Sequence, residues 1–249
     1  MKLLVLVAGV LDPKWPLAPD VGGLQEPTAE RMILSPFDEA ALEIALRIRD
    51  VRPEASIRAI VAGGESAAKL ARAVSALNIA DVATIALQAP WDQGAVAHEL
   101  AGACGDTDLI LIGREFGDCD DGLVPPMLAG LLGRQYFGRA QVVGTEGALR
   151  LMREAGGFEE WLPLSAPIVA SVTNDRRCRL RKPLMKNVMI ARQAAIAAIA
   201  AGPAAPRLIE FVGMRELACA RAPVDCEMLE GSHEYQAGRL AEILLKVRQ

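Results

Sequence analysis

Short apolar segments alternate with helical patterns along the first half of the chain, and this alternation is the strongest constraint on the fold. Runs rich in Val, Ile and Leu have the length and composition of buried strands, and they occupy residues 3–11, 56–63, 82–87 and 108–113. Helical patterns follow them at residues 35–48, 65–77, 92–104 and 124–133. A repeated strand–helix order requires a parallel, doubly wound sheet with helices on both faces. We therefore predict an α/β fold.

The composition favours the same fold class. The chain has 249 residues, of which 52% are hydrophobic and only 4% aromatic, so its core is built mainly from Ala, Val, Leu and Ile. Such a core suits helices packed on a parallel sheet. The formal net charge of −4 and the pI of about 5.4 give no electrostatic basis for binding nucleic acid.

The pattern changes after about residue 135. Residues 141–173 alternate in polarity and contain Gly turns, which predicts an antiparallel extension of the sheet. A helix is predicted over 183–201, a linker at 202–206 and an amphipathic helix at 234–247. We divide the chain into an α/β domain at 1–183, a helical segment at 184–201 and a C-terminal arm at 202–249.

Cysteine and histidine usage restricts the chemistry and the compartment. The five cysteines are dispersed without a C-x-x-C motif, which argues against a disulfide framework or a zinc site and favours a reducing, cytoplasmic location. The chain has only two histidines, so a His-based catalytic or metal site is not expected. The apolar run at 3–11 is followed by "DPKWP" rather than a cleavage site, and the Ala-rich run at 194–202 is too short to span a bilayer. No membrane insertion is predicted.

Ligands of open α/β sheets bind beyond the carboxyl ends of the strands, where the strand order reverses. Four loops are placed to contribute, at 9–16, 34–38, 62–66 and 113–123. The turn "AGGES" at 62–66 fits either a phosphate contact or a simple tight turn. At 35–38, Ser35 is a helix cap, Pro36 suits the first helical position and Asp38 lies in the first turn.

The loop "GREFGDCDDG" at 113–122 is the most polar of the four. Asp118, Asp120 and Asp121 fit either a divalent cation or capping of the next helix. Capping together with exposure to solvent is favoured, because their spacing matches no standard metal loop. Acidic neighbours should raise the pKa of Cys119, which argues against a nucleophile. No Ser-His-Asp set or paired-carboxylate site is evident, so no metal site and no catalytic residue is assigned.

Four segments in order resemble the β subunit of electron-transfer flavoproteins. They are "KLLVLVAGVLDP" at 2–13, "SPFDEAALEIALRI" at 35–48, "DLILIGREFGDCDDGLVPPMLAGLLG" at 108–133 and "REAGGFEEWLPLSAPIVASVT" at 153–173. The similarity spans about residues 1–192. It implies an electron-carrier subunit rather than a self-contained enzyme. It also implies an α-subunit partner that holds most of a shared FAD, and a flavin-containing dehydrogenase as electron donor.

The resemblance implies a buried AMP in the β subunit, or a second FAD in bifurcating relatives. By matching positions, the pocket residues are Leu6, Ser35, Pro36, Phe37, Asp38, Ala62, Gly113, Arg114, Asp118, Asp120, Asp121, Gly122, Leu123 and Val124. Phe37 also lies toward the shared flavin, which Asp12 and Pro13 approach.

Several pocket positions depart from the family pattern. Ser35 stands where Asn is usual, and Gly122, Leu123 and Val124 replace Asn, Gln and Thr. The Lys-Arg pair that usually follows the first strand is Ala8–Gly9 here. These changes remove hydrogen-bonding and positive groups, and they leave open whether AMP, a second FAD or neither occupies the pocket.

Partner contacts follow from the same resemblance. Glu154 matches a residue that meets an Arg of the α subunit, although a solvated strand Glu is an equal reading from sequence. Residues 184–193 resemble a loop that docks the dehydrogenase, and the matched residues are Leu184, Met185, Lys186 and Asn187. The alternative there is a plain amphipathic helix. The arm after residue 202 is expected to pack on the α subunit.

Two other functions remain open on the sequence. One is an AMP-free structural subunit of a larger flavin dehydrogenase complex, which the altered loop motivates. The other is a lone nucleotide-binding domain of the stress-protein type, which shares the fold but needs neither a docking loop nor an arm.

Overall fold

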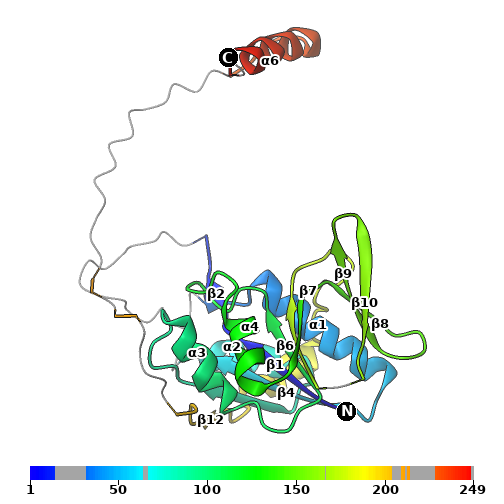
Figure 1. Ribbon diagram of the computed structural model, residues 1–249. Helices are drawn as coiled ribbons and strands as arrows, with labels where there is room; N and C mark the ends of the chain where they lie inside the picture. Colours follow the sequence, from blue (N-terminus) through cyan, green and yellow to red (C-terminus); the bar gives the residue numbers. More distant parts are fainter. Residues whose placement is uncertain are drawn as a thin grey trace. The chain divides into compact units, whose positions relative to one another are not determined.

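The computed structural model describes residues 1–14, 32–63, 67–165, 167–203, 209–210, 212–213 and 228–247 (Figure 1). The chain forms two units, Met1–Gly213 and Met214–Gln249. The described part of the second unit contains the helix α6 (His233–Val247), which confirms the amphipathic helix predicted near the end of the chain.

The first unit is built on a seven-stranded sheet with the order β12-β5-β4-β1-β6-β11-β7. Every neighbouring pair in this sheet is parallel, as the strand–helix alternation predicts. The strands are β1 (Lys2–Val7), β4 (Ser56–Ala62), β5 (Asp81–Ile85), β6 (Leu109–Gly113), β7 (Gln135–Ala140), β11 (Ile168–Val172) and β12 (Ala197–Ile199). The chain builds outward from β1 through β4 to β5 and then returns to β6, on the other side of β1. The strand order therefore reverses between β1 and β6.

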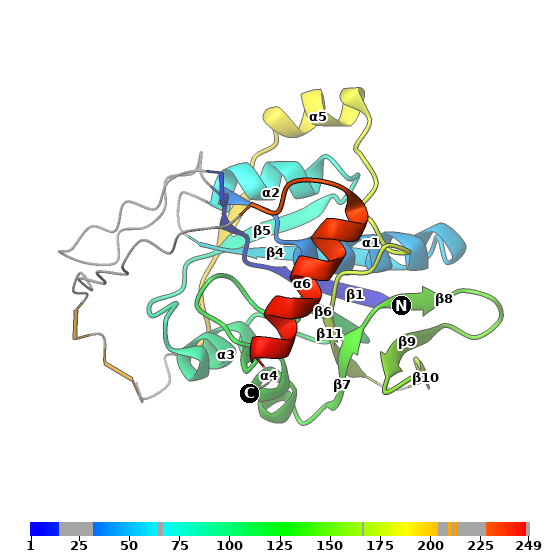
Figure 2. The ribbon, with the colours of Figure 1, turned by 90° about the horizontal axis from the view of Figure 1, so that it is seen from above.

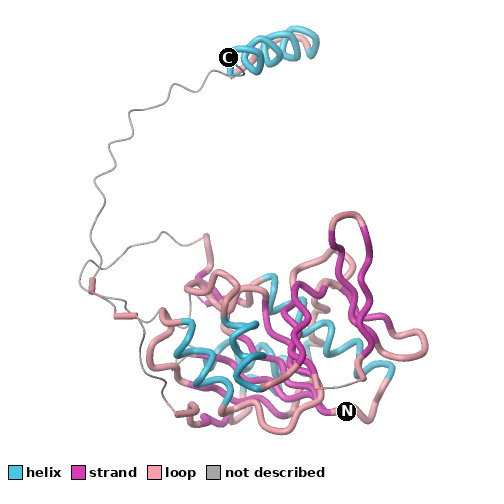
Figure 3. Tube along the Cα trace, viewed as in Figure 1, coloured by secondary structure: helices cyan, strands magenta, loops and turns pink. Residues whose placement is uncertain are grey.

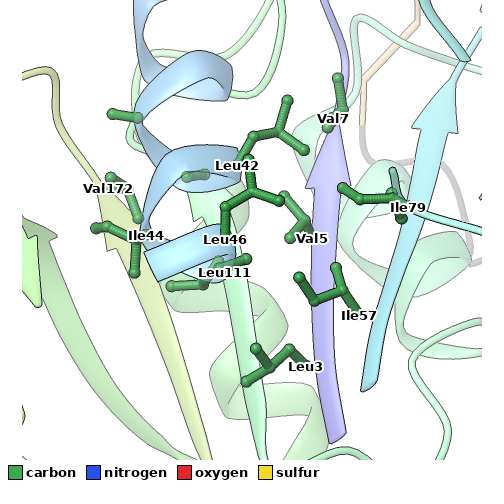
Figure 4. Close-up of a cluster of buried hydrophobic side chains, with 14 of the residues drawn as sticks. Leu3, Val5, Val7, Leu42, Ile44, Leu46, Ile57, Ile79, Leu111 and Val172 are labelled. Carbon is green, nitrogen blue, oxygen red and sulfur yellow. The ribbon is translucent and has the colours of Figure 1, made fainter. Parts of the chain in front are cut away.

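Helices cover both faces of this sheet (Figure 2). They are α1 (Pro36–Val51), α2 (Ala67–Ser75), α3 (Gln93–Ala101) and α4 (Val124–Leu132). A further helix, α5 (Met185–Arg192), packs against α2. Side chains alternate along β1, so Leu3, Val5 and Val7 pack with α1 and α2, whereas Leu4 and Leu6 pack with α3 and α4. Figure 4 shows α1 over the sheet, with its leucines facing the first of these two clusters.

Two small antiparallel sheets lie outside the central one (Figure 3). One contains β8 (Val142–Gly144), β9 (Arg150–Ala155) and β10 (Phe158–Pro163), and the other pairs β2 (Val10–Leu11) with β3 (Met32–Ile33). The antiparallel prediction is confirmed over 142–163 but is wrong for β11. All five residues of β11 are buried and pair in parallel with β6 and β7, as suits a strand covered on both faces.

The predicted continuous strand at 3–11 is broken at Ala8–Gly9. Gly9 has a φ of +72°, which an L residue rarely adopts, and an added Cβ there would meet Leu70 Cδ1 at 2.4 Å. The chain therefore turns at Gly9 and enters the short strand β2 instead of extending β1.

The Ala-rich segment corrects the predicted helix at 183–201. That helix ends at Arg192, and residues 197–199 form β12, which pairs in parallel with β5. Ile196 and Ile199 pack in the clusters on opposite faces of the sheet, which a strand permits. A helix would place them on one face, because they are three residues apart. Pairing with β5 therefore overrides the helix propensity of alanine.

We expect the close packing of the chain after β12 against the end of α3 to require glycine at positions 102 and 202. Gly202 N–H donates to Glu99 O at 2.9 Å, and a Cβ on Gly102 would lie 2.6 Å from Gly202 Cα. Gly102→Ala should lower the free energy of unfolding by about 1–3 kcal/mol, because backbone has to move. Gly130→Ala is the control, since a Cβ in that part of α4 meets nothing within 4 Å. Urea unfolding should show it as neutral or stabilising by up to about 1 kcal/mol, and equal losses for the two variants would contradict this packing.

Candidate functional site

The predicted pocket residues gather around the carboxyl ends of β1 and β6, where the strand order reverses. Three segments meet there: the turn after β1, the start of α1 and the loop 114–123 after β6. Leu6 is fully buried in the core beneath this edge, and Ala62 ends the neighbouring strand β4. Within the predicted turn 62–66, Gly63 N–H donates to Ile85 O at 2.9 Å, and residues 64–66 lie outside the described residues.

Asp38 joins the start of α1 to the end of β1. Its carboxylate accepts hydrogen bonds from the N–H groups of Gly9 at 3.1 Å, Ser35 at 3.0 Å and Ala8 at 3.4 Å. Ser35 Oγ accepts in turn from Asp38 N–H at 3.0 Å, which completes a capping box. Burial raises the pKa of Asp38, and these hydrogen bonds oppose the shift. The predicted cap and the proline at the helix start are confirmed.

Asp120 gathers the backbone donors of the loop after β6. One carboxylate oxygen accepts from Phe116 N–H at 2.8 Å. The other accepts from Gly122 at 2.9 Å, Leu123 at 2.8 Å and Val124 at 3.2 Å. Gly122 precedes α4, Leu123 is its N-cap residue and Val124 is its first residue, so Asp120 binds the backbone at the start of that helix. This agrees with the predicted capping role, but Asp120 is buried and not exposed to solvent as predicted.

The other acids of this loop have different roles. Asp118 accepts from Leu11 N–H at 2.8 Å and so ties the loop to β2. Asp121 is exposed and lies 3.4 Å from the side-chain amide of Gln93. Burial, and then the charge of Asp118, raises the pKa of Cys119, in the predicted direction. In the described part of the chain, no group of three or more His, Cys, Asp or Glu side chains is placed to hold a metal ion.

Phe37 and Arg114 form the rim of the site. The Arg114 guanidinium lies 4.8 Å from the centroid of the Phe37 ring, and it is paired with Glu115. Arg114 N–H donates to Val172 O at 2.8 Å, which fixes the loop to β11. Asp12 accepts from Lys14 N–H at 3.0 Å, and Pro13 beside it is exposed. The rim therefore presents a half-buried aromatic ring beneath a cation.

A separate cleft of about 530 Å³ lies between the start of α1 and the segment after β11. Pro36 and Glu39 line one side, and residues between Asn174 and Leu180 line the other. Pro36 is the one predicted pocket residue in its lining. The predicted residues therefore form a hydrogen-bonded cluster at the sheet edge rather than the walls of this cleft.

The predicted partner residues are not part of the cluster. Glu154 belongs to β9, where its carboxylate accepts from Arg177 at 2.7 Å. Leu184 and Met185 are more than 70% exposed at the start of α5, and Lys186 and Asn187 follow them in that helix.

Sequence reasoning missed two carboxylates that are bound by arginines. One is Glu154, which Arg177 binds. The other is buried Glu43, which accepts from Arg47 and Arg181, each at 3.0 Å. The four-residue spacing of Glu43 and Arg47 on a helix was a usable signal for the second.

Carboxylates of the chain occupy the described backbone donors of this cluster. The N–H groups of Ala8, Gly9, Leu11, Phe116, Gly122, Leu123 and Val124 all donate to carboxylates of the chain itself. Groups of this kind bind phosphate at such a sheet edge, and the other predicted phosphate turn, at 64–66, lies outside the described residues.

The parallel, doubly wound sheet with a site at its switch point defines an α/β protein of nucleotide-binding type. A family model described as "Electron transfer flavoprotein domain" matches residues 23–204. The electron transfer flavoprotein subunit beta of Syntrophomonas wolfei is 26% identical over 216 residues, which cover 85% of each chain. The mitochondrial subunit beta of Oryza sativa subsp. indica is 31% identical over 208 residues, covering 79% of this chain and 80% of the relative. The Bradyrhizobium diazoefficiens subunit beta is 28% identical over 205 residues, covering 79% and 80%.

The chain therefore belongs to the electron transfer flavoprotein family, and its relatives support the role of a β subunit. The family's β subunits are electron-carrier subunits, in agreement with the sequence interpretation. None of the helices in the described part of the chain has both the length and the apolar composition needed to cross a membrane.

We expect Asp38→Asn to lower the free energy of unfolding by about 1–3 kcal/mol at neutral pH, because an amide oxygen cannot accept all three N–H groups. The loss should depend on pH. Since the folded-state pKa of Asp38 is raised above 3.8, its contribution to stability is fully present below that value and falls as pH rises through the raised pKa. The loss caused by Asp38→Asn should therefore be larger in acid than at neutral pH.

Urea unfolding at several pH values measures this dependence. Glu54→Gln is the control, because Glu54 is an exposed carboxylate without a described partner. It should change stability by less than about 0.5 kcal/mol. A loss for Asp38→Asn that grows as pH rises would contradict the assignment.

Proposed function

We propose that the chain is the β subunit of a heterodimeric electron transfer flavoprotein. It carries electrons from a flavin-containing dehydrogenase to an acceptor through one FAD, which the α subunit mostly holds. One observation carries this proposal: the chain offers a rim for a flavin ring, at Phe37 and Arg114, whereas the N–H groups described beside it in the loop after β6 already have an acceptor within the chain. This arrangement fits an FAD whose flavin ring contacts this chain and whose phosphates are bound by the α subunit.

The residues of this chain then orient and shield the flavin. Bound FAD supplies the electron chemistry, because its ring can accept and release electrons. Phe37 supplies an aromatic surface, and Arg114 places a cation above that surface. The loop of Asp12 and Pro13 contributes to the same rim.

Exposed apolar side chains support contact with other proteins. On α5 and just before it, Leu184 is 71%, Met185 74% and Met189 53% exposed, and methionine adapts well to partner surfaces. We assign residues 184–201 to docking of the dehydrogenase. Glu154 remains a candidate contact for the α subunit, and its bond to Arg177 would have to yield to a partner cation.

The arm at 202–249 is assigned to packing on the α subunit. The helix α6 has no buried residue, and Leu240, Leu244 and Val247 are at least half exposed. A helix of 15 residues is marginal in water without a packing partner. Exposed faces on α5 and α6 favour a subunit over a lone nucleotide-binding domain of the stress-protein type.

The AMP-free form of the subunit is favoured over the AMP-bound form. The loop after β6 supports this choice, because Gly122, Leu123 and Val124 stand where the family pattern has Asn, Gln and Thr and so offer no side-chain hydrogen bond to a phosphate. A second FAD is disfavoured for the same reason. We also propose a reducing, cytoplasmic compartment, which the free thiols of Cys104, Cys119 and Cys178 support.

Co-expression with an α-subunit gene tests the function. The complex should purify as a heterodimer with a flavin absorption spectrum and one FAD per pair. Phe37→Leu should lower FAD affinity roughly three- to tenfold, because it removes an aromatic contact. Phe158→Leu is the matched control, since Phe158 is 77% exposed on β10 and far from the rim in sequence. A chain that is stable alone, without flavin or partner, would exclude this function.

Docking through α5 can be tested separately. Met185→Glu with Met189→Glu should slow reduction of the complex by its dehydrogenase about tenfold, which corresponds to about 1.4 kcal/mol of lost association energy. FAD content should not change. Val51→Glu, an exposed apolar position at the end of α1, is the control. An unchanged rate in the double variant would remove α5 from the docking surface.

A further inference from the structure

The cleft beside the start of α1 has no role in the proposed flavin site, although it lies next to it. Its volume is about 530 Å³. One wall carries Pro36 and Glu39, whose positions in the sequence flank the rim residue Phe37, and the other wall is the segment 174–180 that follows β11. Because β11 pairs in parallel with β6, this segment leaves the sheet at the edge that carries the switch point. The cleft therefore lies beside the place where the flavin ring is expected.

The second wall belongs to the most basic stretch of an acidic chain. Residues 176–182, "RRCRLRK", carry five cationic side chains in seven positions, whereas the chain as a whole has a net charge of −4. Like charges at such spacing repel one another, so the stretch needs anionic partners. The contacts of each cation show which of them find such partners within the chain.

Two of the five cations are neutralised by carboxylates of the chain. Arg177 binds Asp175 at 2.9 Å and Glu154 at 2.7 Å. Arg181 binds the buried carboxylate of Glu43 at 3.0 Å. These bonds tie the segment to β9 and to α1, and so they hold its backbone in place at the cleft.

Arg176 and Arg179 are the cations that line the cleft. Both are exposed, and among the described residues neither guanidinium has a hydrogen-bonded or ion-paired partner. The Asn174 amide lies in the same lining. A guanidinium is weakly hydrated and offers a planar pair of N–H donors, which match the two oxygens of a carboxylate. This wall therefore fits a carboxylate partner.

The acids in the lining do not cancel this charge. Asp175 is taken by Arg177, whose hydrogen bonds lower the pKa of that carboxyl and keep it ionised. Glu39, on the opposite wall, has no cation within ion-pair distance among the described residues, and burial raises the pKa of its carboxyl. Two guanidinium groups therefore share the cleft with one uncompensated carboxylate, which leaves a positive charge for a further anion to balance.

The position of the cleft indicates which partner supplies that anion. On one wall, Pro36 precedes Phe37, which is proposed to contact the flavin. On the other wall, Arg176 precedes Arg177, whose partner Glu154 is proposed to contact the α subunit. A subunit that contacts both positions also covers the cleft, because the two walls carry their immediate neighbours.

We propose that Arg176 and Arg179 form a docking site for carboxylate side chains of the α subunit that holds the shared FAD. The contact adds an attraction that depends on ionic strength and steers the two subunits together. This inference rests on the proposed function, because that function supplies the partner.

Charge reversal in the co-expressed heterodimer tests the docking site. Arg176→Glu with Arg179→Glu should weaken subunit association by about tenfold at low salt, because carboxylates would then face carboxylates. The wild-type dissociation constant should rise steeply with NaCl concentration, and that of the variant should change less. Sedimentation velocity over a dilution series measures both constants, and thermal melting of each complex shows that the variant is folded.

Arg72→Glu with Lys182→Glu is the matched control. It changes the net charge by the same amount, and both residues are exposed and lie outside the cleft lining. It should associate within about twofold of wild type. Glu39→Gln removes the competing carboxylate, so association should tighten. Arg176→Lys with Arg179→Lys keeps the charge and loses the planar donor pair, so it should lose less affinity than the reversal.

Equal dissociation constants for the reversal variant and the control would overturn the proposal, as would weaker association of Glu39→Gln. Citrate, a small tricarboxylate, is compared with NaCl of equal ionic strength. If citrate raised the wild-type Tm while the reversal left association unchanged, the cleft would be a site for a free small anion instead. A wild-type preparation without heterodimer or flavin would contradict the proposed function itself, whereas a flavin-containing heterodimer that ignores the reversal overturns the docking site alone.

Discussion

The buried carboxylate of Asp38 is the interaction on which the arrangement of the site depends. It closes the capping box at the start of α1 and also binds the backbone at the end of β1. Hydrogen bonds to a charged group contribute about 1.5–3 kcal/mol each, which offsets part of the cost of burying it. Because the pKa of Asp38 is raised, burial outweighs those bonds in setting its ionisation. The same side chain thus fixes where the first helix begins and how the rim with Phe37 is presented.

Two buried carboxyl groups on α1 show how environment decides ionisation. Asp38 has only backbone and hydroxyl partners, and its pKa is raised. Burial opposes ionisation of Glu43 too, but hydrogen bonds from Arg181 and Arg47 outweigh it and lower the pKa of Glu43. Glu43 ties α1 to the segment that leads from β11 to α5. The helix α1 therefore holds both the rim and the segment that leads to the proposed docking helix α5.

The sequence was sufficient to predict the features that depend on local chemistry. Ser35, Pro36 and Asp38 predicted the start of α1, and the apolar runs predicted a parallel sheet. The strand β12 was not predictable, because alanine favours helix locally and only the unpaired edge of β5 makes the extended form favourable. The acids of the loop after β6 suggested a cap, but the pairing of Asp118 with the backbone of β2 depends on a long-range contact. The roles of the predicted site residues in binding stay predictions.

The central claim is that this chain is an electron-carrier subunit that shares one FAD with a partner and binds no nucleotide of its own. Denaturing the purified heterodimer and quantifying the released nucleotides by chromatography tests that claim most directly. The account predicts one FAD and no AMP per heterodimer. One FAD with one AMP, or two FAD, would contradict it, because either result would require a second nucleotide in the complex.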